Sequence, residues 1–429
     1  MSVPVIEVSI WGERVGALAS DPTLGVYAFA YLPSWRRRGI ELAPLTMPLS
    51  DGRNTFLFPN LPEATFHRLP GMPADALPDD FGNALIDAWM AEHGIQKRGI
   101  TTLDRLAYMG KRGMGALEFR PAHGSQRESA APLKMKSLVE EARKLVSGNL
   151  AIDTHAKAAL ANMIKVGTSA GGARAKAVIA WNPKTNEIRS GQFDVASGFE
   201  HWILKFDGVG QYPELGVGED YGRIEYAYYK MAIAAGLRMS DSRLLEENGR
   251  AHFMTKRFDR DARKGRTVKH HMQSLCALSH LDFKQRATHA YAQLFMAIAQ
   301  LALGDEVTAE IFRRMAFNVM ARNCDDHTKN FGFVLKQGRG WELAPAYDVT
   351  HAYNPKGEWT YQHLMSVNGK FEEITREDLL VEADRFGVRR AKDLLADVRG
   401  ALENWTAYAN ESGLRKATAD RVSKDFRLL

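Results

Sequence analysis

A short polar stretch around residue 325 has the residue types and the spacing that phosphoryl transfer requires. Asp325 is followed five positions later by Asn330, and a second acid, Asp348, comes after a short strand-like segment. A carboxylate can orient an attacking hydroxyl, and amide and carboxylate oxygens are the ligands that Mg²⁺ prefers. Protein kinases use this order of acid, asparagine and downstream acid to position a hydroxyl and hold magnesium. We therefore predict Asp325 as a catalytic residue, and Asn330 and Asp348 as metal ligands.

Two basic residues of the same stretch, Lys329 and His327, are predicted to have different roles. Lys329 is predicted to be catalytic, because its charge can neutralise the transferred phosphate when negative charge spreads over the phosphate oxygens. His327 is assigned to the nucleotide-binding residues, as a hydrogen-bonding group that holds the loop rather than as a base.

The chain between Asn330 and Asp348 is expected to fold back on itself. The segments 331–335 and 341–343 have the pattern of two strands, and the glycines at 338 and 340 lie between them. A hairpin at this point returns the chain, so that Asp348 faces Asn330.

Such a site also needs a lysine that binds the nucleotide phosphates and an acid that pairs with it. Lys205 is the one charged residue within the short apolar run 202–206, and a charge in a buried strand needs a partner. Glu225 lies near the start of a predicted helix over 222–235 and is the candidate partner. Two plainer interpretations stay open: Lys205 can face water from an edge strand, and Glu225 can simply be favoured by the helix dipole.

A glycine-rich segment over 166–177 is the candidate phosphate-binding loop. Gly167 and Gly172 lack side chains, so backbone N–H groups can approach an anion closely. The segment fits neither the Walker A pattern nor Gly-x-Gly-x-x-Gly, and an ordinary turn before a strand at 177–181 remains an alternative. After the strand that begins near Phe253, Lys256 and Phe258 are expected to meet the adenine edge; a strand ending in a charged turn is the alternative.

The order of predicted elements indicates an α+β fold of the protein-kinase-like, two-lobed kind. Strands dominate residues 4–31, where Ile6, Val8 and Ile10 alternate with polar residues, and Thr101 is the expected cap of a helix that follows it. A polar linker is expected near 120–132, and strands follow the glycine-rich segment. Helices are predicted over 222–235, 286–302 and 306–322, and again within 373–413. We predict three parts: an N-terminal subdomain over 1–125, the nucleotide-binding part of the small lobe over 126–259, and a helical catalytic lobe over 260–429.

Composition restricts the class of protein. The chain has 429 residues, 45% hydrophobic and 25% charged, with a net charge of +6. We expect no membrane span and no signal peptide. Cys276 and Cys324 are too few for a disulfide framework or a zinc site, so a reduced cytoplasm is the expected compartment. The positive charge is compatible with a nucleic acid or an acidic partner, and equally with a slightly basic soluble protein.

Six motifs of the chain belong together: Asn323-x-Asp325-Asp326-His327-x-Lys329-Asn330-Phe331, Tyr347-Asp348-Val349-Thr350, Lys256-Arg257-Phe258-Asp259-Arg260, Ser169-x-x-Gly172-x-x-x-Lys176, Val15-Gly16-Ala17-Leu18 and Gly115-Ala116-Leu117-Glu118. With these motifs the chain resembles the HipA family of bacterial toxin kinases. The resemblance implies transfer of phosphate from ATP, with Mg²⁺, to serine or threonine of a protein target that acts in translation, such as an aminoacyl-tRNA synthetase. It also adds Lys176 and Ser169 to the nucleotide-binding residues.

The resemblance further implies self-regulation and a partner. Ser169 is expected to be autophosphorylated, and a phosphate there would repel the nucleotide phosphates that the loop must hold. A helix-turn-helix antitoxin is the expected partner, with operator DNA contacted mainly through it. Two alternatives stay open: a kinase of the same fold acting on a small molecule, and a weakly catalytic co-regulator of the antitoxin.

Overall fold

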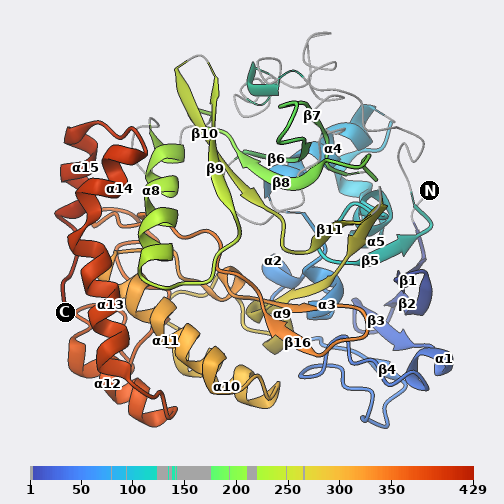
Figure 1. Cartoon of the computed structure of the whole chain (residues 1–429). Helices are drawn as coiled ribbons and strands as arrows, with labels where there is room; N and C mark the ends of the chain where they lie inside the picture. Colours follow the sequence, from blue (N-terminus) through green and yellow to red (C-terminus); the bar gives the residue numbers. More distant parts are fainter. Residues whose placement is uncertain are drawn as a thin grey trace. The chain divides into compact units, whose positions relative to one another are not determined.

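The computed structural model describes residues 3–78, 80–92, 94–122, 134, 138–140, 142, 175–192, 194–209, 220–247, 249–263 and 266–429 (Figure 1). The chain forms two compact units. Unit 1 consists of Met1–Gly210, Lys256–His280 and Val334–Gly340, and unit 2 consists of Gln211–Thr255, Leu281–Phe333 and Trp341–Leu429. Each unit is built from separate stretches of sequence. The predicted part boundaries at residues 125 and 259 stay a prediction.

Unit 1 opens with a five-stranded antiparallel sheet in the order β4-β3-β2-β1-β5. The predicted alternation in the first strand is confirmed, because Ile6, Val8 and Ile10 are fully buried. Trp11 and Gly12 form a two-residue hairpin loop, both with positive φ, which matches the right-handed twist of the flanking strands. The strands are β1 Val5–Ile10, β2 Glu13–Asp21, β3 Val26–Tyr31, β4 Thr55–Phe56 and β5 Leu117–Arg120.

Short helices accompany this sheet, and the best defined of them is α5. Its predicted cap at Thr101 is confirmed: Thr101 Oγ1 accepts from the Asp104 amide (3.1 Å), and Asp104 Oδ2 accepts from the Thr101 amide (2.8 Å). Asp104 Oδ1 also accepts from the Val3 amide (2.9 Å), which ties the first strand to the helix. The helices are α1 Pro33–Arg36, α2 Glu63–Phe66, α3 Gly71–Ala74, α4 Asp80–Glu92, η1 Lys97–Gly99 and α5 Thr102–Met109.

The rest of unit 1 supplies the strands that follow the glycine-rich segment. Strand β6 is buried along its whole length and pairs antiparallel with β7 on one side and β8 on the other. Strands β11 and β12 form an antiparallel hairpin. The bounds are β6 Lys176–Trp181, β7 Ile188–Ser190, β8 Glu200–Lys205, β11 Arg260–Arg263, β12 Arg266–Lys269, β13 His271–Ser274 and α9 Leu275–Ser279.

Unit 2 is mainly helical, as predicted for this part of the chain. Helix α8 lies beside α13 and α14, and α11 packs against α10 and α13 (Figure 1). The helices predicted over 222–235 and 306–322 occur as α8 and α11. Its helices are α8 Tyr221–Ala234, α10 Tyr291–Gln300, α11 Asp305–Met320, η2 Thr328–Asn330, α12 Arg376–Arg385, α13 Ala391–Glu403, α14 Trp405–Glu411 and α15 Lys416–Ser423.

One helix begins later than the sequence predicted. The expected helix over 286–302 is α10 from Tyr291 only, because His289 and Ala290 form strand β14 and pair in parallel with β17. The strands with residues in unit 2 are β9 Ser242–Glu247, β10 Arg250–Lys256, β14 His289–Ala290, β15 Gly332–Leu335, β16 Trp341–Leu343 and β17 Met365–Ser366. Among the described residues, no helix is long and apolar enough to span a membrane.

Candidate active site

The loop between α11 and β15 in unit 2 holds two adjacent acids in opposite environments. The side chain of Asp325 is 48% exposed, whereas Asp326 is 1% exposed. The start of the loop is anchored to Ala352, because the Cys324 amide donates to the Ala352 carbonyl (3.0 Å) and the Ala352 amide donates to the Arg322 carbonyl (3.2 Å). The buried acid therefore fixes the loop, and the exposed acid is presented to solvent, where a substrate hydroxyl can reach it.

Three donors hold the buried carboxylate of Asp326. The hydroxyl of Tyr291 donates to Oδ2 (2.7 Å), the Leu364 amide donates to Oδ1 (2.7 Å), and His363 Nδ1 lies 2.9 Å from Oδ2. Burial lowers the pKa of His363, but the Asp326 carboxylate outweighs it and raises that pKa to about 10. His363 is therefore an imidazolium at neutral pH, and Asp326 has a charged partner inside the protein.

The same network continues into helix α11. Asn318 Nδ2 donates to the Tyr291 hydroxyl (3.0 Å), and Asn323 Nδ2 donates to Asn318 Oδ1 (2.9 Å). Burial and the Asp326 charge raise the pKa of Tyr291 well above its usual value, so its hydroxyl stays a donor. The sequence did not reveal this support: His363 lies 37 residues from Asp326, and nothing in the pair Asp325-Asp326 says which acid is buried.

Asn330 is folded back onto the residue it was predicted to work with. Its Nδ2 donates to the Asp325 carbonyl (2.7 Å), and its amide donates to the His327 carbonyl (2.9 Å) within the short helix η2. Because the side-chain nitrogen is engaged, Oδ1 is the atom of Asn330 suited to ligate a metal. Asp325 and Asn330 are thus brought together by the local fold of the loop.

Lys329 and His327 lie against one aromatic ring. The Lys329 ammonium is 5.1 Å from the centre of the Phe283 ring, and the His327 ring centre is 5.2 Å from it. His327 Nε2 also lies 3.8 Å from Asp325 Oδ1. These contacts agree with a positioning role for His327 in the loop, while its predicted contact with a nucleotide stays a prediction.

The residue before Asp348, Tyr347, connects this part of the chain to the loop. The Tyr347 hydroxyl donates to the Lys329 carbonyl (2.8 Å), so the residue before Asp348 is fixed to the loop. Gly332 makes room for that tyrosine, because a Cβ at Gly332 would lie 3.1 Å from the Tyr347 hydroxyl oxygen. The predicted chain reversal is confirmed by the Ala344 amide, which donates to the Gly332 carbonyl (2.9 Å).

Asp348 itself has a left-handed backbone conformation, with φ of 53°. Residues other than glycine seldom adopt it, and such conformations gather at functional sites. Among the described residues, no group of three or more His, Cys, Asp or Glu side chains could hold a metal by itself. The pair Asn330 and Asp348 nevertheless fits Mg²⁺, which takes oxygen donors from one or two protein side chains together with substrate phosphates and waters.

The remaining predicted residues fall elsewhere. Lys205 ends β8 in unit 1 and stands opposite Lys176 in the β6–β8 register, whereas Glu225 is 2% exposed in α8 of unit 2. Their pairing stays a prediction. Gly167, Ser169 and Gly172 lie outside the described residues, so the glycine-rich loop and its phosphorylation also stay predictions.

The segment predicted to meet the adenine edge has structural contacts that the sequence did not indicate. Lys256 Nζ donates to Glu200 Oε1 (2.7 Å), and the Arg257 amide donates to the His201 carbonyl (2.9 Å). Phe258 is half-buried. These contacts tie the segment to β8 within unit 1, and contact with an adenine ring stays a prediction.

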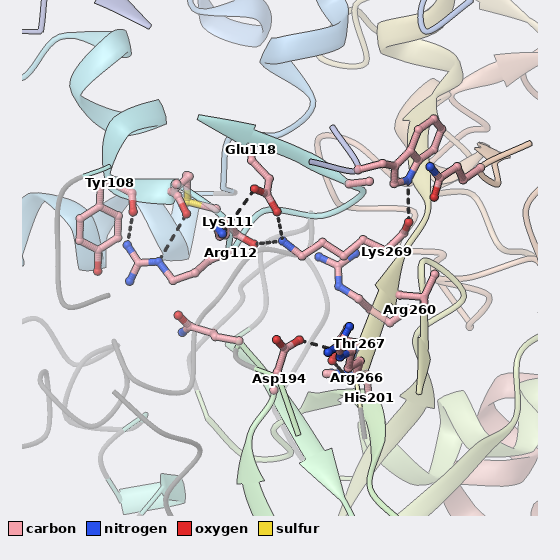
Figure 2. Close-up of a pocket in the computed structure, with 18 residues that line it drawn as sticks. Tyr108, Lys111, Arg112, Glu118, Asp194, His201, Arg260, Arg266, Thr267 and Lys269 are labelled. Carbon is pink, nitrogen blue, oxygen red and sulfur yellow. Dashed lines mark hydrogen bonds and ion pairs between the residues drawn. The ribbon is translucent and has the colours of Figure 1, made fainter. Parts of the chain in front are cut away.

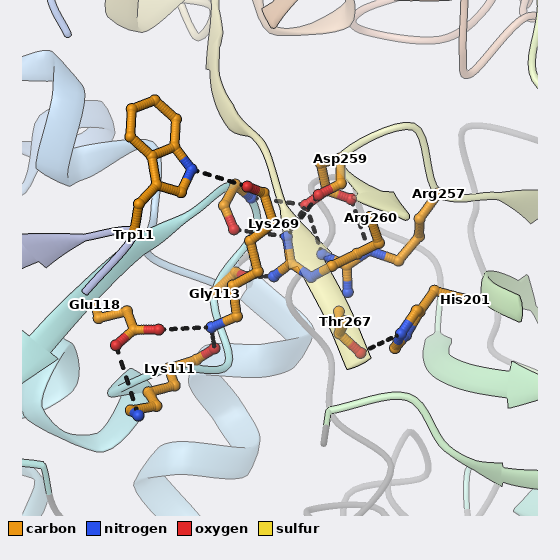
Figure 3. Close-up of polar contacts among 11 residues, drawn as sticks. Trp11, Lys111, Gly113, Glu118, His201, Arg257, Asp259, Arg260, Thr267 and Lys269 are labelled. Atoms are coloured by element: carbon orange, nitrogen blue, oxygen red, sulfur yellow. Dashed lines mark hydrogen bonds and ion pairs between the residues drawn. The ribbon is translucent and has the colours of Figure 1, made fainter. Parts of the chain in front are cut away.

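The other residues of that motif form a buried cluster (Figure 3). Asp259 is fully buried and accepts from Arg257 Nε (2.8 Å), from Arg260 Nη1 (2.8 Å) and from the Gly115 amide (2.8 Å). Arg260 Nη2 also donates to the Gly113 carbonyl (2.8 Å). The motif therefore holds the turn before β5, and this role was missed from the sequence.

Unit 1 also contains a polar cavity of ≈ 630 Å³ that is lined by none of the predicted site residues (Figure 2). Basic side chains from the loop after α5 and from the β11–β12 hairpin face this cavity. It is therefore separate from the phosphoryl-transfer residues described above.

Two family models match the chain. The HipA N-terminal domain matches residues 6–120, and the HipA-like C-terminal domain matches residues 168–406. Among solved structures, the Shewanella oneidensis MR-1 toxin–antitoxin complex of HipA, HipB and operator DNA contains a similar chain. The TM-score is 0.68 at 19% identity, over 98% of this chain and 94% of that chain. This likeness confirms the predicted α+β, protein-kinase-like fold class.

A second solved structure, the Helicobacter pylori proinflammatory kinase CtkA, has a TM-score of 0.33 at 12% identity. It covers 53% of this chain and 88% of that chain. No curated protein matches the sequence.

Proposed function

The chain belongs to the HipA family, and from this premise we propose that it is a serine/threonine protein kinase that uses ATP and Mg²⁺. The observation that carries the proposal is the loop in unit 2, where Asp325 is exposed beside Asn330 and Tyr347 fixes the approach of Asp348. Phosphoryl transfer depends mainly on positioning and on charge stabilisation, and this loop supplies both.

Each residue of the loop has a defined task in this proposal. Asp325 accepts the proton of the attacking hydroxyl, and its exposure leaves room for a protein substrate. Asn330 and Asp348 would hold Mg²⁺, which would supply charge neutralisation at the nucleotide phosphates. Lys329 lies one residue from Asn330 and stabilises the negative charge that develops on the transferred group. Lys205, Lys176 and the glycine-rich loop would hold the nucleotide.

The wider role follows from the family. We propose that the chain is the cytoplasmic toxin of a toxin–antitoxin system, that its target acts in translation, and that it phosphorylates its own Ser169. The solved HipA–HipB–operator DNA complex supports a HipB-like antitoxin as the partner. We further propose, from the family resemblance, that this antitoxin is a helix-turn-helix protein and that operator DNA is contacted mainly through it. The resulting arrest of translation would produce persistence. A small-molecule kinase and a weakly catalytic co-regulator remain the alternatives.

Nucleotide binding and self-labelling test the proposal together. Wild-type protein should bind an ATP analogue only with Mg²⁺, and Asp348→Asn should weaken that binding at least tenfold because one metal ligand loses its charge. With ATP and Mg²⁺, mass spectrometry should find phosphate on Ser169, and Ser169→Ala should remove it. Metal-independent binding that Asp348→Asn leaves unchanged would contradict the assigned role of Asp348. Absence of phosphate from the wild-type chain would contradict self-phosphorylation.

A further inference from the structure

The polar cavity in unit 1 has an excess of positive charge. Figure 2 shows Lys111, Arg112 and Lys269 on one side of an open space, with Arg266, Asp194 and His201 on the other side. Five basic residues line it against two acids, Glu118 and Asp194. His201 adds no charge, because burial and the nearby guanidinium of Arg257 lower its pKa to about 4. The five basic residues are Lys111, Arg112, Arg260, Arg266 and Lys269.

Two of these cations face each other across the β11–β12 hairpin. Arg260 and Lys269 are cross-strand partners in the antiparallel register, and like charges directly opposite destabilise a sheet. Burial and the Arg260 charge lower the pKa of Lys269 to about 8. An anion in the cavity would offset this repulsion, and the protein itself offsets only part of it, through Asp259 and Glu118.

The basic side chains of the cavity differ in their protein contacts. Some have their donors engaged by the protein, whereas others keep donors that can bind a ligand. Arg260 is occupied by Asp259 and by the carbonyls of Gly113 and Gly115, as Figure 3 shows. Lys269 Nζ donates to the Lys111 carbonyl (2.7 Å) and to Glu118 Oε1 (3.1 Å), which leaves one of its three N–H groups.

Two further cations have weak protein contacts. Lys111 Nζ lies 3.7 Å from Glu118 Oε2 and is 56% exposed. Arg266, at the start of β12, is exposed at the cavity, and its guanidinium has no hydrogen bond or ion pair within the described part of the chain. A guanidinium offers a planar fork of donors that matches a phosphate or a carboxylate.

We propose that this cavity binds a small free polyanion of the pyrophosphate class, with Arg266, Lys269 and Lys111 as its charged donors. The volume of ≈ 630 Å³ is within the range of small-molecule sites and exceeds what a single monovalent ion needs. The three donors come from two segments that line the same cavity, the loop after α5 and the β11–β12 hairpin. A molecule with several adjacent negative charges can accept from both segments at once. The site lies within unit 1 and does not depend on the phosphoryl-transfer residues.

Calorimetric titration of the full-length protein with pyrophosphate tests this site. The buffer contains a chelator, so that Mg²⁺-dependent binding of pyrophosphate at the proposed nucleotide site does not contribute. Wild type should bind one pyrophosphate, inorganic phosphate should bind more weakly, and a citrate titration reports whether carboxylates are accepted. Arg266→Gln and Lys269→Gln should each weaken binding about tenfold, while Arg37→Gln, which removes an exposed arginine elsewhere in unit 1, should leave it unchanged.

A variant that gains affinity guards against loss of folding as the explanation. Asp194→Asn removes an exposed acid from the cavity, and it should tighten pyrophosphate binding severalfold because less negative charge competes with the ligand. Asp325→Asn, in unit 2, should leave binding unchanged. Absence of pyrophosphate binding to wild type would overturn the proposal, and so would binding that both Arg266→Gln and Lys269→Gln leave intact.

Discussion

Among the described residues, Asp259 in unit 1 and Asp326 in unit 2 are the two least exposed aspartates, and their partners differ. Asp259 in unit 1 lies between two guanidiniums and a backbone amide. Asp326 in unit 2 is held by a tyrosine hydroxyl, an imidazolium and a backbone amide. Arginine keeps its charge at all accessible pH values, whereas histidine does not. The first aspartate is therefore a permanent anchor, and the second depends on a proton.

The difference matches what each aspartate holds. Burial raises the pKa of Asp259, but the charges of Arg257 and Arg260 outweigh it and keep that pKa below its usual range. This cluster fixes the turn at Gly113–Gly115 against the β11 strand. Asp326 instead supports a loop whose neighbouring acid, Asp325, must stay exposed. Asp259 therefore contributes mainly to the stability of unit 1, and Asp326 contributes mainly to the geometry of the candidate site.

The largest expected effect on stability comes from removing the permanent anchor. Asp259→Ala leaves two buried guanidiniums without their carboxylate, and breaking a buried ion pair in this way costs about 3–5 kcal/mol. Urea unfolding, followed through its first transition, measures the loss. Asp397→Ala, on the exposed side of α13, should change the free energy of unfolding by less than about 0.5 kcal/mol. A loss for Asp259→Ala as small as that of the control would contradict its role as the anchor.

A smaller effect on stability, but a clear one on turnover, is expected for Asp326→Asn. The amide keeps the size of the side chain and removes the charge opposite His363, so the loop should lose its fixed position. The proposed phosphoryl transfer should fall roughly 10- to 100-fold, as when the support of a ligand is removed. In NMR titrations the pKa of His363 should drop from about 10, because burial then acts without the carboxylate. Unchanged turnover together with a lowered pKa of His363 would contradict a role of this network in catalysis.

The smallest effect is the response of the two units to pH. Burial, as the largest cause, lowers the pKa of His201, His271 and His280 in unit 1 to about 4. The unfolded chain therefore takes up these protons first, and unit 1 should lose stability as pH falls from about 6.5 toward 4. His363 has a raised pKa, so its contribution is complete below about pH 6.5 and is lost as pH rises toward 10.

Pulse proteolysis with peptide mapping at several pH values distinguishes the two units. Acid should expose unit 1 first, and alkali should expose unit 2 first, with changes of about 1–3 kcal/mol. His271→Gln removes one of the neutral histidines and should reduce the acid sensitivity of unit 1 alone. Equal sensitivity of both units in acid and in alkali would remove the distinction between them.

Local patterns predicted much of the fold and the centre of the candidate site. Strand alternation at Ile6, Val8 and Ile10 and the cap at Thr101 depend on neighbouring residues, so the sequence alone indicates them. The contact between Asp325 and Asn330 is likewise made within one short loop. The start of α10 was predicted too early because strand pairing of His289 with Met365 cannot be seen locally.

Features built from distant residues were not predictable. The burial of Asp326 depends on Tyr291 and His363, which come from other elements. The cavity of unit 1 joins Lys111 to Lys269, which lie 158 residues apart. In the motif at 256–260 the sequence indicated roles for Lys256 and Phe258 at the adenine edge, but not the buried cluster that its arginines and Asp259 form with Gly115, 144 residues away. Long-range pairing of charges leaves no periodic signal in a sequence.

Transfer of labelled γ-phosphate from ATP, with Mg²⁺, by wild type and by Asp325→Asn tests the central claim most directly. Asp325 is exposed and outside the Asp326 network, so the variant should fold and bind nucleotide as wild type does. Wild type should label its own chain, and the variant should lose labelling by about a thousandfold, because the hydroxyl is no longer oriented by a carboxylate. Equal labelling of the two proteins would contradict the assignment of this loop as the catalytic site.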